Sequence, residues 1–280
     1  MIPSFLTPIS YPLTPRTTNY HKNIWNIFEG FTPLPQFLKL SLLFSIKPMK
    51  KISFVLSALL ISTLSFAQTA EEIVGNYVKA VGGTEAIAKI KDLTITMTGE
   101  AQGASLEIII QKKPANKFVQ TVNVTGMGEV SKTVCDGTKA QIGGMQGSQD
   151  VTEPAKVKAI SMQAMIVPEA EYVASGAKLT LQGKEKVGEE EAYKILVEAG
   201  ETKLTEFYSV ASGLKIRQVV TAESPMGTQT ITSDYSDYKE VSGVKMPYKM
   251  SQDLGMMQLA LTASKIEANT NLADALFEIK

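Results

Sequence analysis

The residues of this chain that are spaced closely enough for acid–base catalysis are aspartates and glutamates. Glu189, Glu190 and Glu191 are consecutive, and Asp234 and Asp237 are three positions apart. A general acid–base pair needs one carboxyl with a raised pKa, which requires burial or a close like charge. The glutamates fall in a predicted turn, where water solvates them. The aspartates fall on opposite faces of a predicted strand, so we expect neither a catalytic pair nor a shared metal site.

Nucleophilic and metal-binding chemistry lacks its usual side chains. The one histidine is His21 and the one cysteine is Cys135. The part of the chain after residue 67 therefore excludes Ser-His-Asp and Cys-His arrangements and histidine-based zinc sites. Cys135 is expected to be a small buried residue, with a redox role as the weaker alternative. We expect no enzyme activity, no cofactor and no metal.

The beginning of the chain differs in composition from the rest. Residues 1–48 hold seven of the twelve prolines, the only tryptophan (Trp25) and the only histidine. Neither a period of 3.6 nor one of 2 runs through them, and proline interrupts them repeatedly. We predict that residues 1–48 are a spurious extension of the reading frame that does not fold.

The stretch that follows, "MKKISFVLSALLISTLSFAQT", has the three parts of a secretory signal peptide. Lys50 and Lys51 supply the charged region, residues 52–64 supply the apolar region, and Ser65-Phe66-Ala67 places small residues before the cleavage point. We therefore predict a signal peptide over residues 49–67.

Cleavage after Ala67 is expected to release a periplasmic protein that begins at Gln68. A transmembrane anchor is the alternative reading of the same apolar run. Serines and threonines interrupt the run, however, and the acidic pair Glu71-Glu72 follows it in place of a basic stop-transfer cluster.

Residues 68–280 are predicted to form a single domain. They carry 22 basic and 27 acidic side chains. This mildly acidic balance does not indicate the basic surface that binding of nucleic acid requires. One cysteine cannot form an intramolecular disulfide, so stability must come from a buried core, for which the length suffices.

Three helices are expected in this domain. "TAEEIVGNYVKAVGG" begins with Thr69 and has Glu72 three residues later, which is a capping box, and its apolar residues recur at helical spacing. "TEAIAKI" is predicted to be a short helix capped by Thr84. "TEPAKVKAISMQAMIVP" is predicted to be an interior helix capped by Thr152, with Pro154 in its first turn.

Elsewhere the hydrophobic period is 2. In "LTITMTG", for example, Leu93, Ile95 and Met97 share one face, and about a dozen such segments follow one another with short turns. Asp136-Gly137 predicts a two-residue type I′ hairpin turn. The fold class is therefore mainly β with α (α+β), with a curved antiparallel sheet or barrel whose concave side the helices fill.

Methionine is over-represented after residue 67, with ten Met against three Phe and no Trp. Its flexible thioether side chain suits adaptable apolar binding surfaces, although ordinary core filling is an alternative that accounts equally well for the excess. We predict an apolar cavity between the sheet and the interior helix that accepts an acyl chain. Its predicted lining comes from that helix and the late strands: Val157, Ile160, Met162, Met165, Met246, Met250 and Met257.

Several short signatures, in order along residues 69–280, carry a family resemblance. They are "VGGTEAIAKIKDLTITMTG", "CDGTKA", "KVGEEEAYKILVE", "DYKEVSGVKMPYKM" and "NLADALFEI". In this order they resemble the outer-membrane lipoprotein-sorting proteins of the LolA/LolB-like superfamily, in the form found in Bacteroidetes-type bacteria.

The resemblance implies a half-open antiparallel β-barrel of about 11 strands, with helices plugging its concave side and a hydrophobic cavity for acyl chains. It also implies a carrier rather than an enzyme. Carriers of this family are known for an arginine that holds a helical lid shut. The only arginine after residue 67 is Arg217, on a late predicted strand, so this role is not assigned.

Together these observations predict a periplasmic carrier that binds lipid or an acylated lipoprotein in a hydrophobic half-barrel. Envelope proteins are further candidate partners, contact with the membrane is expected to be peripheral, and nucleic acid is not a partner. The alternative is a non-catalytic structural or interaction protein of the cell envelope that has no lipid ligand.

Overall fold

The computed structural model describes residues 68–280, except residues 102, 115, 200–201, 225–226, 256 and 280. The described residues belong to one compact unit. The predicted spurious extension and the signal peptide lie outside the described residues. Within the described part of the chain, no helix is both long enough and apolar enough to cross a bilayer.

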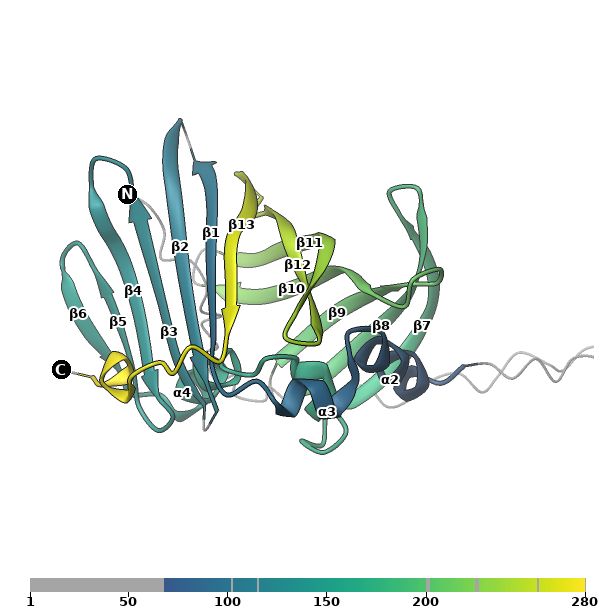
Figure 1. Ribbon diagram of the computed structural model, residues 1–280. Coiled ribbons are helices and arrows are strands. Elements are labelled where there is room, and N and C mark those ends of the chain that lie inside the picture. The colour runs from purple at the N-terminus through teal and green to yellow at the C-terminus, as the bar shows by residue number, and fades with distance from the viewer. Residues whose placement is uncertain are drawn as a thin grey trace, which may run out of the picture. The chain divides into compact units, whose positions relative to one another are not determined.

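In the part of the chain that the structure describes, thirteen strands form one antiparallel sheet, in the order β6-β5-β4-β3-β2-β1-β13-β12-β11-β10-β9-β8-β7 (Figure 1). Two meanders, β1–β6 and β7–β13, are joined by the pairing of β1 with β13, and the sheet stays open because β6 and β7 are its two edges. The strands are β1 (Leu93–Ala101), β2 (Ala104–Lys113), β3 (Lys117–Val124), β4 (Gly128–Asp136), β5 (Ala140–Gly144), β6 (Gly147–Val151), β7 (Lys178–Val187), β8 (Glu190–Ala199), β9 (Thr202–Ser209), β10 (Lys215–Ser224), β11 (Gly227–Val241), β12 (Val244–Asp253) and β13 (Gln258–Ala268).

The predicted fold class is confirmed, but about 11 strands is too low a count. One missed strand is β6, which the polar sequence "GSQDV" presents as a loop. Four of its five residues are exposed, so the sequence shows no alternating buried face. It is a strand because it pairs along its whole length with β5 at the edge of the sheet.

Within the described residues, three α-helices and two short 3₁₀ helices accompany the sheet: α2 (Ala70–Ala80), α3 (Gly83–Ala88), α4 (Pro154–Met162), η1 (Pro168–Glu171) and η2 (Asp274–Phe277). The capping box of α2 is confirmed. The Glu72 amide donates to Thr69 Oγ1, and the Thr69 amide donates to Glu72 Oε2, both at 3.1 Å.

Two other predicted caps are wrong. The residue before α3 is Gly82 rather than Thr84, and the residue before α4 is Glu153 rather than Thr152; neither makes a side-chain capping bond. Pro154 explains the start of α4, because its fixed φ and missing N–H suit the first position of a helix.

The turn after β4 also differs from its prediction. Asp136 and Ala140 are separated by three residues, and Asp136 Oδ1 accepts hydrogen bonds from the amides of Thr138 and Lys139, both at 2.7 Å. The aspartate side chain closes the loop together with a backbone hydrogen bond from the Asp136 amide to the carbonyl oxygen of Lys139 at 3.1 Å. Asp136-Gly137 is not a type I′ pair, because that turn needs a positive φ at both residues and only Gly137 has one.

Strand register identifies which face of the sheet carries the helices. Leu93 lies opposite Lys112, and Lys112 lies opposite Phe118, so the three share one face. Leu93 packs in a cluster with α2, and Phe118 packs with Ile160 of α4. We call this the helix-bearing face. The adjacent Val119 points the other way and packs against η2 on the outer face.

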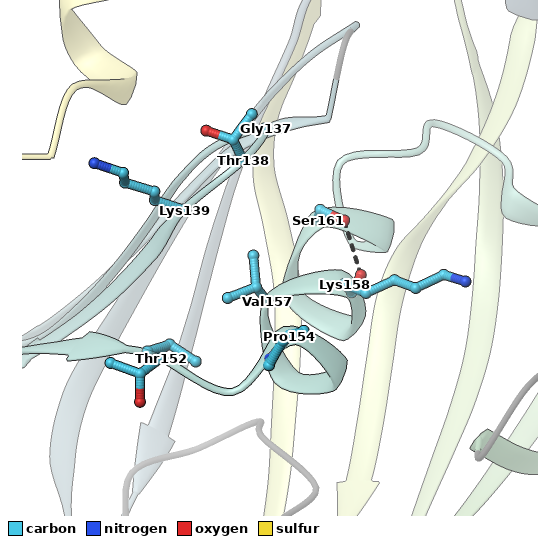
Figure 2. A pocket seen from close by; sticks show the side chains of 9 residues that line it. Gly137, Thr138, Lys139, Thr152, Pro154, Val157, Lys158 and Ser161 are labelled. Atoms are coloured by element: carbon cyan, nitrogen blue, oxygen red, sulfur yellow. Dashed lines mark hydrogen bonds between the residues drawn. The ribbon is translucent and has the colours of Figure 1, made fainter.

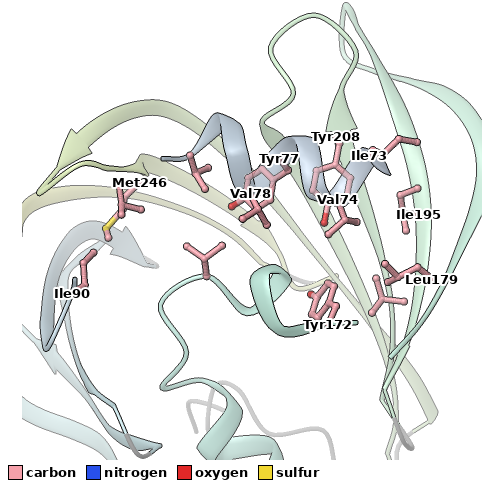
Figure 3. Close-up of a cluster of buried hydrophobic side chains, with 14 of the residues drawn as sticks. Ile73, Val74, Tyr77, Val78, Ile90, Tyr172, Leu179, Ile195, Tyr208 and Met246 are labelled. Carbon is pink, nitrogen blue, oxygen red and sulfur yellow. The ribbon is translucent and has the colours of Figure 1, made fainter. Parts of the chain in front are cut away.

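The largest core cluster lies between α2 and strands of the second meander. Ile73, Val74, Tyr77 and Val78 of α2 point toward strand residues such as Ile195 (Figure 3). Burying a large apolar side chain contributes about 1.5–3 kcal/mol, so this stripe fixes α2 on the helix-bearing face.

The turn between α2 and α3 depends on a glycine, which gives a prediction for stability. Gly82 has φ +131°, and a Cβ added there would lie 2.2 Å from the carbonyl oxygen of Gly243. We expect Gly82→Ala to destabilise the protein by more than about 2 kcal/mol, because the positive φ of residue 82 and the close contact with the turn between β11 and β12 both resist a side chain.

Gly75 is the matched control, because it lies within α2 and a Cβ there meets nothing within 4 Å. Gly75→Ala should raise stability by about 0.5–1 kcal/mol through helix propensity. Urea denaturation of both variants checks the pair, and equal effects would show that the α2–α3 turn imposes no such constraint.

Candidate functional site

An apolar cluster made only of strand residues lies on the helix-bearing face beyond the helices. Its members come from β1, β2, β3 and β13, and the half-buried Met250 of β12 packs against them. We call this group the strand cluster: Met97, Leu106, Val122, Val124, Leu259 and Leu261. These residues occupy alternate positions of their strands, which is why the sequence directs them to one face.

Half-buried isoleucines lead from the strand cluster toward the helices. Ile95 lies opposite Ile110, and Met97 lies opposite Ile108, all on the helix-bearing face. Ile108 packs against the strand cluster, Ile110 packs against the cluster under α4, and Ile95 packs against both the strand cluster and the α2 cluster. The seam between β1 and β2 is thus an apolar path between the two helical parts.

The structure distributes the seven predicted cavity residues over several places. Val157 and Ile160 belong with Phe118 in the cluster under α4, whereas Met246 is buried under α2 and α3. Met250 borders the strand cluster. The remaining three, Met162, Met165 and Met257, are half-buried outside these clusters. The predicted lining residues are therefore divided among separate packing clusters of the described part of the chain.

A cavity of about 480 Å³ lies beside α4, between the helix and the turn after β4. Val157 points from α4 toward Thr138 and Lys139 of that turn (Figure 2). Ser161, on the same helix, donates its hydroxyl hydrogen to the carbonyl oxygen of Lys158 at 2.8 Å. Of the seven predicted lining residues, Val157 is the one that lines this cavity.

A second cavity, of about 730 Å³, is lined by both polar and apolar residues, among them Leu106 and Val124. Its side chains include Thr98, Glu107 and Asn123, which register places on the outer face. Asn123 Nδ2 donates to Glu107 Oε2 at 3.2 Å.

A buried polar network fixes the segment that connects α4 to β7, residues 163–177, which we call the bridge segment. Glu169 of this segment forms an ion pair with Lys215 of β10, and the same amine donates to Glu206 Oε1 of β9 at 3.1 Å. Tyr172 and Tyr208 donate their hydroxyl hydrogens to Glu206 at 3.0 and 2.5 Å. All these side chains are 10% exposed or less.

The electrostatics of this network follow from burial and mutual attraction. Burial raises the pKa of Glu206, which Lys215 opposes. Burial alone would lower the pKa of Lys215, but the carboxylates of Glu169 and Glu206 raise it well above its ordinary value. The lysine therefore stays charged, and its charge holds the bridge segment to the sheet.

A second contact ties the bridge segment to the first meander. Lys112 Nζ of β2 donates to the carbonyl oxygen of Met165 at 3.0 Å. Burial lowers the pKa of Lys112 to about 8, Glu169 opposes this shift and Lys215 adds to it. The bridge segment thus spans from β2 to β9 and β10.

Arg217 is not part of either tie. It forms a two-pronged ion pair with Asp234 of β11, with Nε–Oδ1 and Nη2–Oδ2 distances of 2.5 and 2.7 Å. Asp237 pairs with Lys239 at 3.1 Å. The two aspartates thus have separate cationic partners, and no group of three or more His, Cys, Asp or Glu side chains in the described ranges is arranged to hold a metal ion.

The buried network contains residues that the sequence reading missed. In "TEFYS", Glu206 occupies the alternate position between Leu204 and Tyr208, where a buried apolar residue is expected. A carboxylate at such a position is the sequence signal for a buried polar network, because a buried charge requires a partner. The identity of that partner, Lys215, is visible only in the tertiary structure, where strand pairing places Lys215 opposite Tyr208 and its amine reaches Glu206.

The methionine excess has more than one structural cause. Met97 and Met246 are buried, whereas Met127 and Met145 are 48% and 71% exposed in turns after β3 and β5. Composition alone therefore did not separate core methionines from exposed ones.

No protein-family model and no curated protein sequence matches the chain. Solved structures do share its fold. A DUF1329 family protein from Desulfovibrio piger has a TM-score of 0.50 and 10% identity, covering 76% of this chain and 98% of its own. A LolA superfamily protein from Nitrosomonas europaea has a TM-score of 0.50 and 12% identity, covering 76% and 99%. The predicted resemblance to the LolA-like superfamily is confirmed for the fold.

The buried network predicts a large cost for removing its cation. Lys215→Met leaves Glu169 and Glu206 buried without a counter-ion, so we expect a loss of about 3–5 kcal/mol in the free energy of unfolding. Lys203→Met is the matched control, because Lys203 is 67% exposed in its ion pair with Glu198 and should cost less than about 1 kcal/mol. Urea denaturation measures both, and similar small losses would show that the network does not hold the bridge segment.

Proposed function

We propose that this chain is a carrier or binding module of the bacterial cell envelope that holds the acyl chains of lipids or acylated lipoproteins. The observation that carries the proposal is the strand cluster, a continuous group of buried apolar side chains on the helix-bearing face to which no helix contributes among the described residues. The fold shared with a LolA superfamily protein supports it.

Apolar burial supplies the driving force for such binding. Each methylene removed from water contributes about 0.8 kcal/mol, so a long acyl chain offsets the cost of ordering it. The half-buried Ile95, Ile108 and Ile110 extend the strand cluster into a path along β1 and β2. The unbranched Met97 and Met250 adapt to chains of different shape.

The open sheet provides a way for the ligand to enter. Edges β6 and β7 do not pair with each other, and the bridge segment crosses between the two meanders through its contacts to Lys112 and Lys215. Displacing the bridge segment would open the buried apolar path to a ligand without breaking a strand pairing. No reaction is part of this role.

The envelope location rests on the predicted signal peptide over residues 49–67. In this proposal the chain is cleaved after Ala67, the mature protein is periplasmic, and its contact with membranes is peripheral.

Neighbouring isoleucines on opposite faces of β2 give the test. Ile108 lies on the helix-bearing face beside the strand cluster, and Ile109 lies on the outer face. Ile108→Glu should weaken binding of a fluorescent fatty acid at least about tenfold, because it places a carboxylate in the apolar path. Ile109→Glu should retain the affinity.

Native mass spectrometry of the mature protein after mild extraction completes the test. The unmodified protein should carry lipid, and Ile108→Glu should carry less. A protein that neither retains lipid nor binds the fluorescent fatty acid would instead be an envelope interaction protein without a lipid ligand.

A further inference from the structure

Strand β2 carries an apolar row that ends in an amine. Leu106, Ile108, Ile110 and Lys112 occupy alternate positions, and their partners on β3 are Val124, Val122, Gln120 and Phe118. All four therefore lie on the helix-bearing face. From Leu106 to Lys112 the strand rises roughly 20 Å, which is on the scale of an extended fatty acyl chain.

The Lys112 amine has no carboxylate in ion-pair contact among the described residues. Its hydrogen bond goes to the neutral carbonyl of Met165, and the nearest acidic influence, Glu169, is paired with Lys215. Lys112 is half-buried, and an ammonium that is partly removed from water without a counter-ion is unfavourable, which is why burial lowers the pKa of Lys112 to about 8. An arriving anion would remove this penalty.

We propose that Lys112 binds the anionic headgroup of an acyl ligand whose chain lies along Ile110, Ile108 and the strand cluster. The inference rests on the proposed function and adds the ligand class, an amphiphile with a single chain and a carboxylate or phosphate head. Lys112 donates to the head oxygen in a charge-assisted hydrogen bond, which is about twice as strong as a neutral one. The Met165 carbonyl holds the amine at the end of the path.

The headgroup contact gives binding a defined pH dependence. A fatty carboxylate, with a pKa near that of Glu, is ionised throughout the range from pH 6.5 to 9.5. Lys112 is charged below about pH 8 and loses its proton above it, while Glu169 and Lys215, the charged groups that influence it, stay paired. Affinity for the carboxylate should therefore fall as pH rises through about 8, and affinity for an alcohol of equal chain length should not.

Calorimetric titration with dodecanoate, dodecanol and dodecylamine tests the proposal on the mature protein. We expect dodecanoate to bind about tenfold more tightly than dodecanol at pH 7, and dodecylamine to bind most weakly. Lys112→Met should remove the preference for dodecanoate and its pH dependence while leaving dodecanol unchanged. Lys112→Arg, which keeps the charge, should restore the preference at pH 7 and make it independent of pH.

Lys132→Met is the matched control. Lys132 is a half-buried lysine of β4 that register places on the outer face, so its removal should leave the preference for dodecanoate intact. Circular dichroism of each variant confirms that it is folded before binding is compared.

Each outcome separates this inference from the proposed function. If the unmodified protein binds dodecanoate and dodecanol equally, the headgroup role is overturned and acyl binding stands. If Lys112→Met weakens all three amphiphiles equally, Lys112 acts only as a tie for the bridge segment, and the headgroup role is again overturned. If no amphiphile binds, both proposals fail.

Discussion

The pairing of β1 with β13 is the constraint on which the rest of the structure depends. It joins residues 93–99 to residues 261–268 and converts two separate meanders into one sheet. The approach is close at Gly99, where a Cβ would lie 2.3 Å from the carbonyl oxygen of Ala260. Without this seam, Met97 and Leu261 would belong to different sheets, and the strand cluster would not exist.

A single sheet also determines how the helices are placed. The helices α2 and α4 pack on the same face of the sheet but over different meanders. Neither of them therefore covers the junction between the two meanders, and another segment must cross it. The bridge segment makes that crossing, and polar contacts fasten it at both sides. Buried ion pairs contribute little net stability, but they accept few alternative geometries. The network of Lys215 with Glu169 and Glu206 therefore specifies where the bridge segment lies more than it stabilises the fold.

Local patterns allowed much of the fold to be predicted. The alternation in "LTITMTG" gave the correct face for Leu93 and Met97, and the Thr69–Glu72 capping box gave the correct start of α2, because both effects act within a few residues. Errors arose where local signals compete. Thr152 and Thr84 are good caps by residue type, but Pro154 and Gly82 decided the starts of α4 and α3.

The candidate site was less predictable, since its parts come from distant segments. The sequence by itself determined that strands with one apolar face dominate, that residues after Ala67 lack histidine, and that β2 ends its apolar row with a lysine. Only the tertiary structure decided that this lysine meets Met165, 53 residues away, and that Glu169 meets Lys215, 46 residues away. Periodicity assigns each side chain to a face, but strand order and the path of the bridge segment select its neighbours, and these depend on packing across the whole sheet.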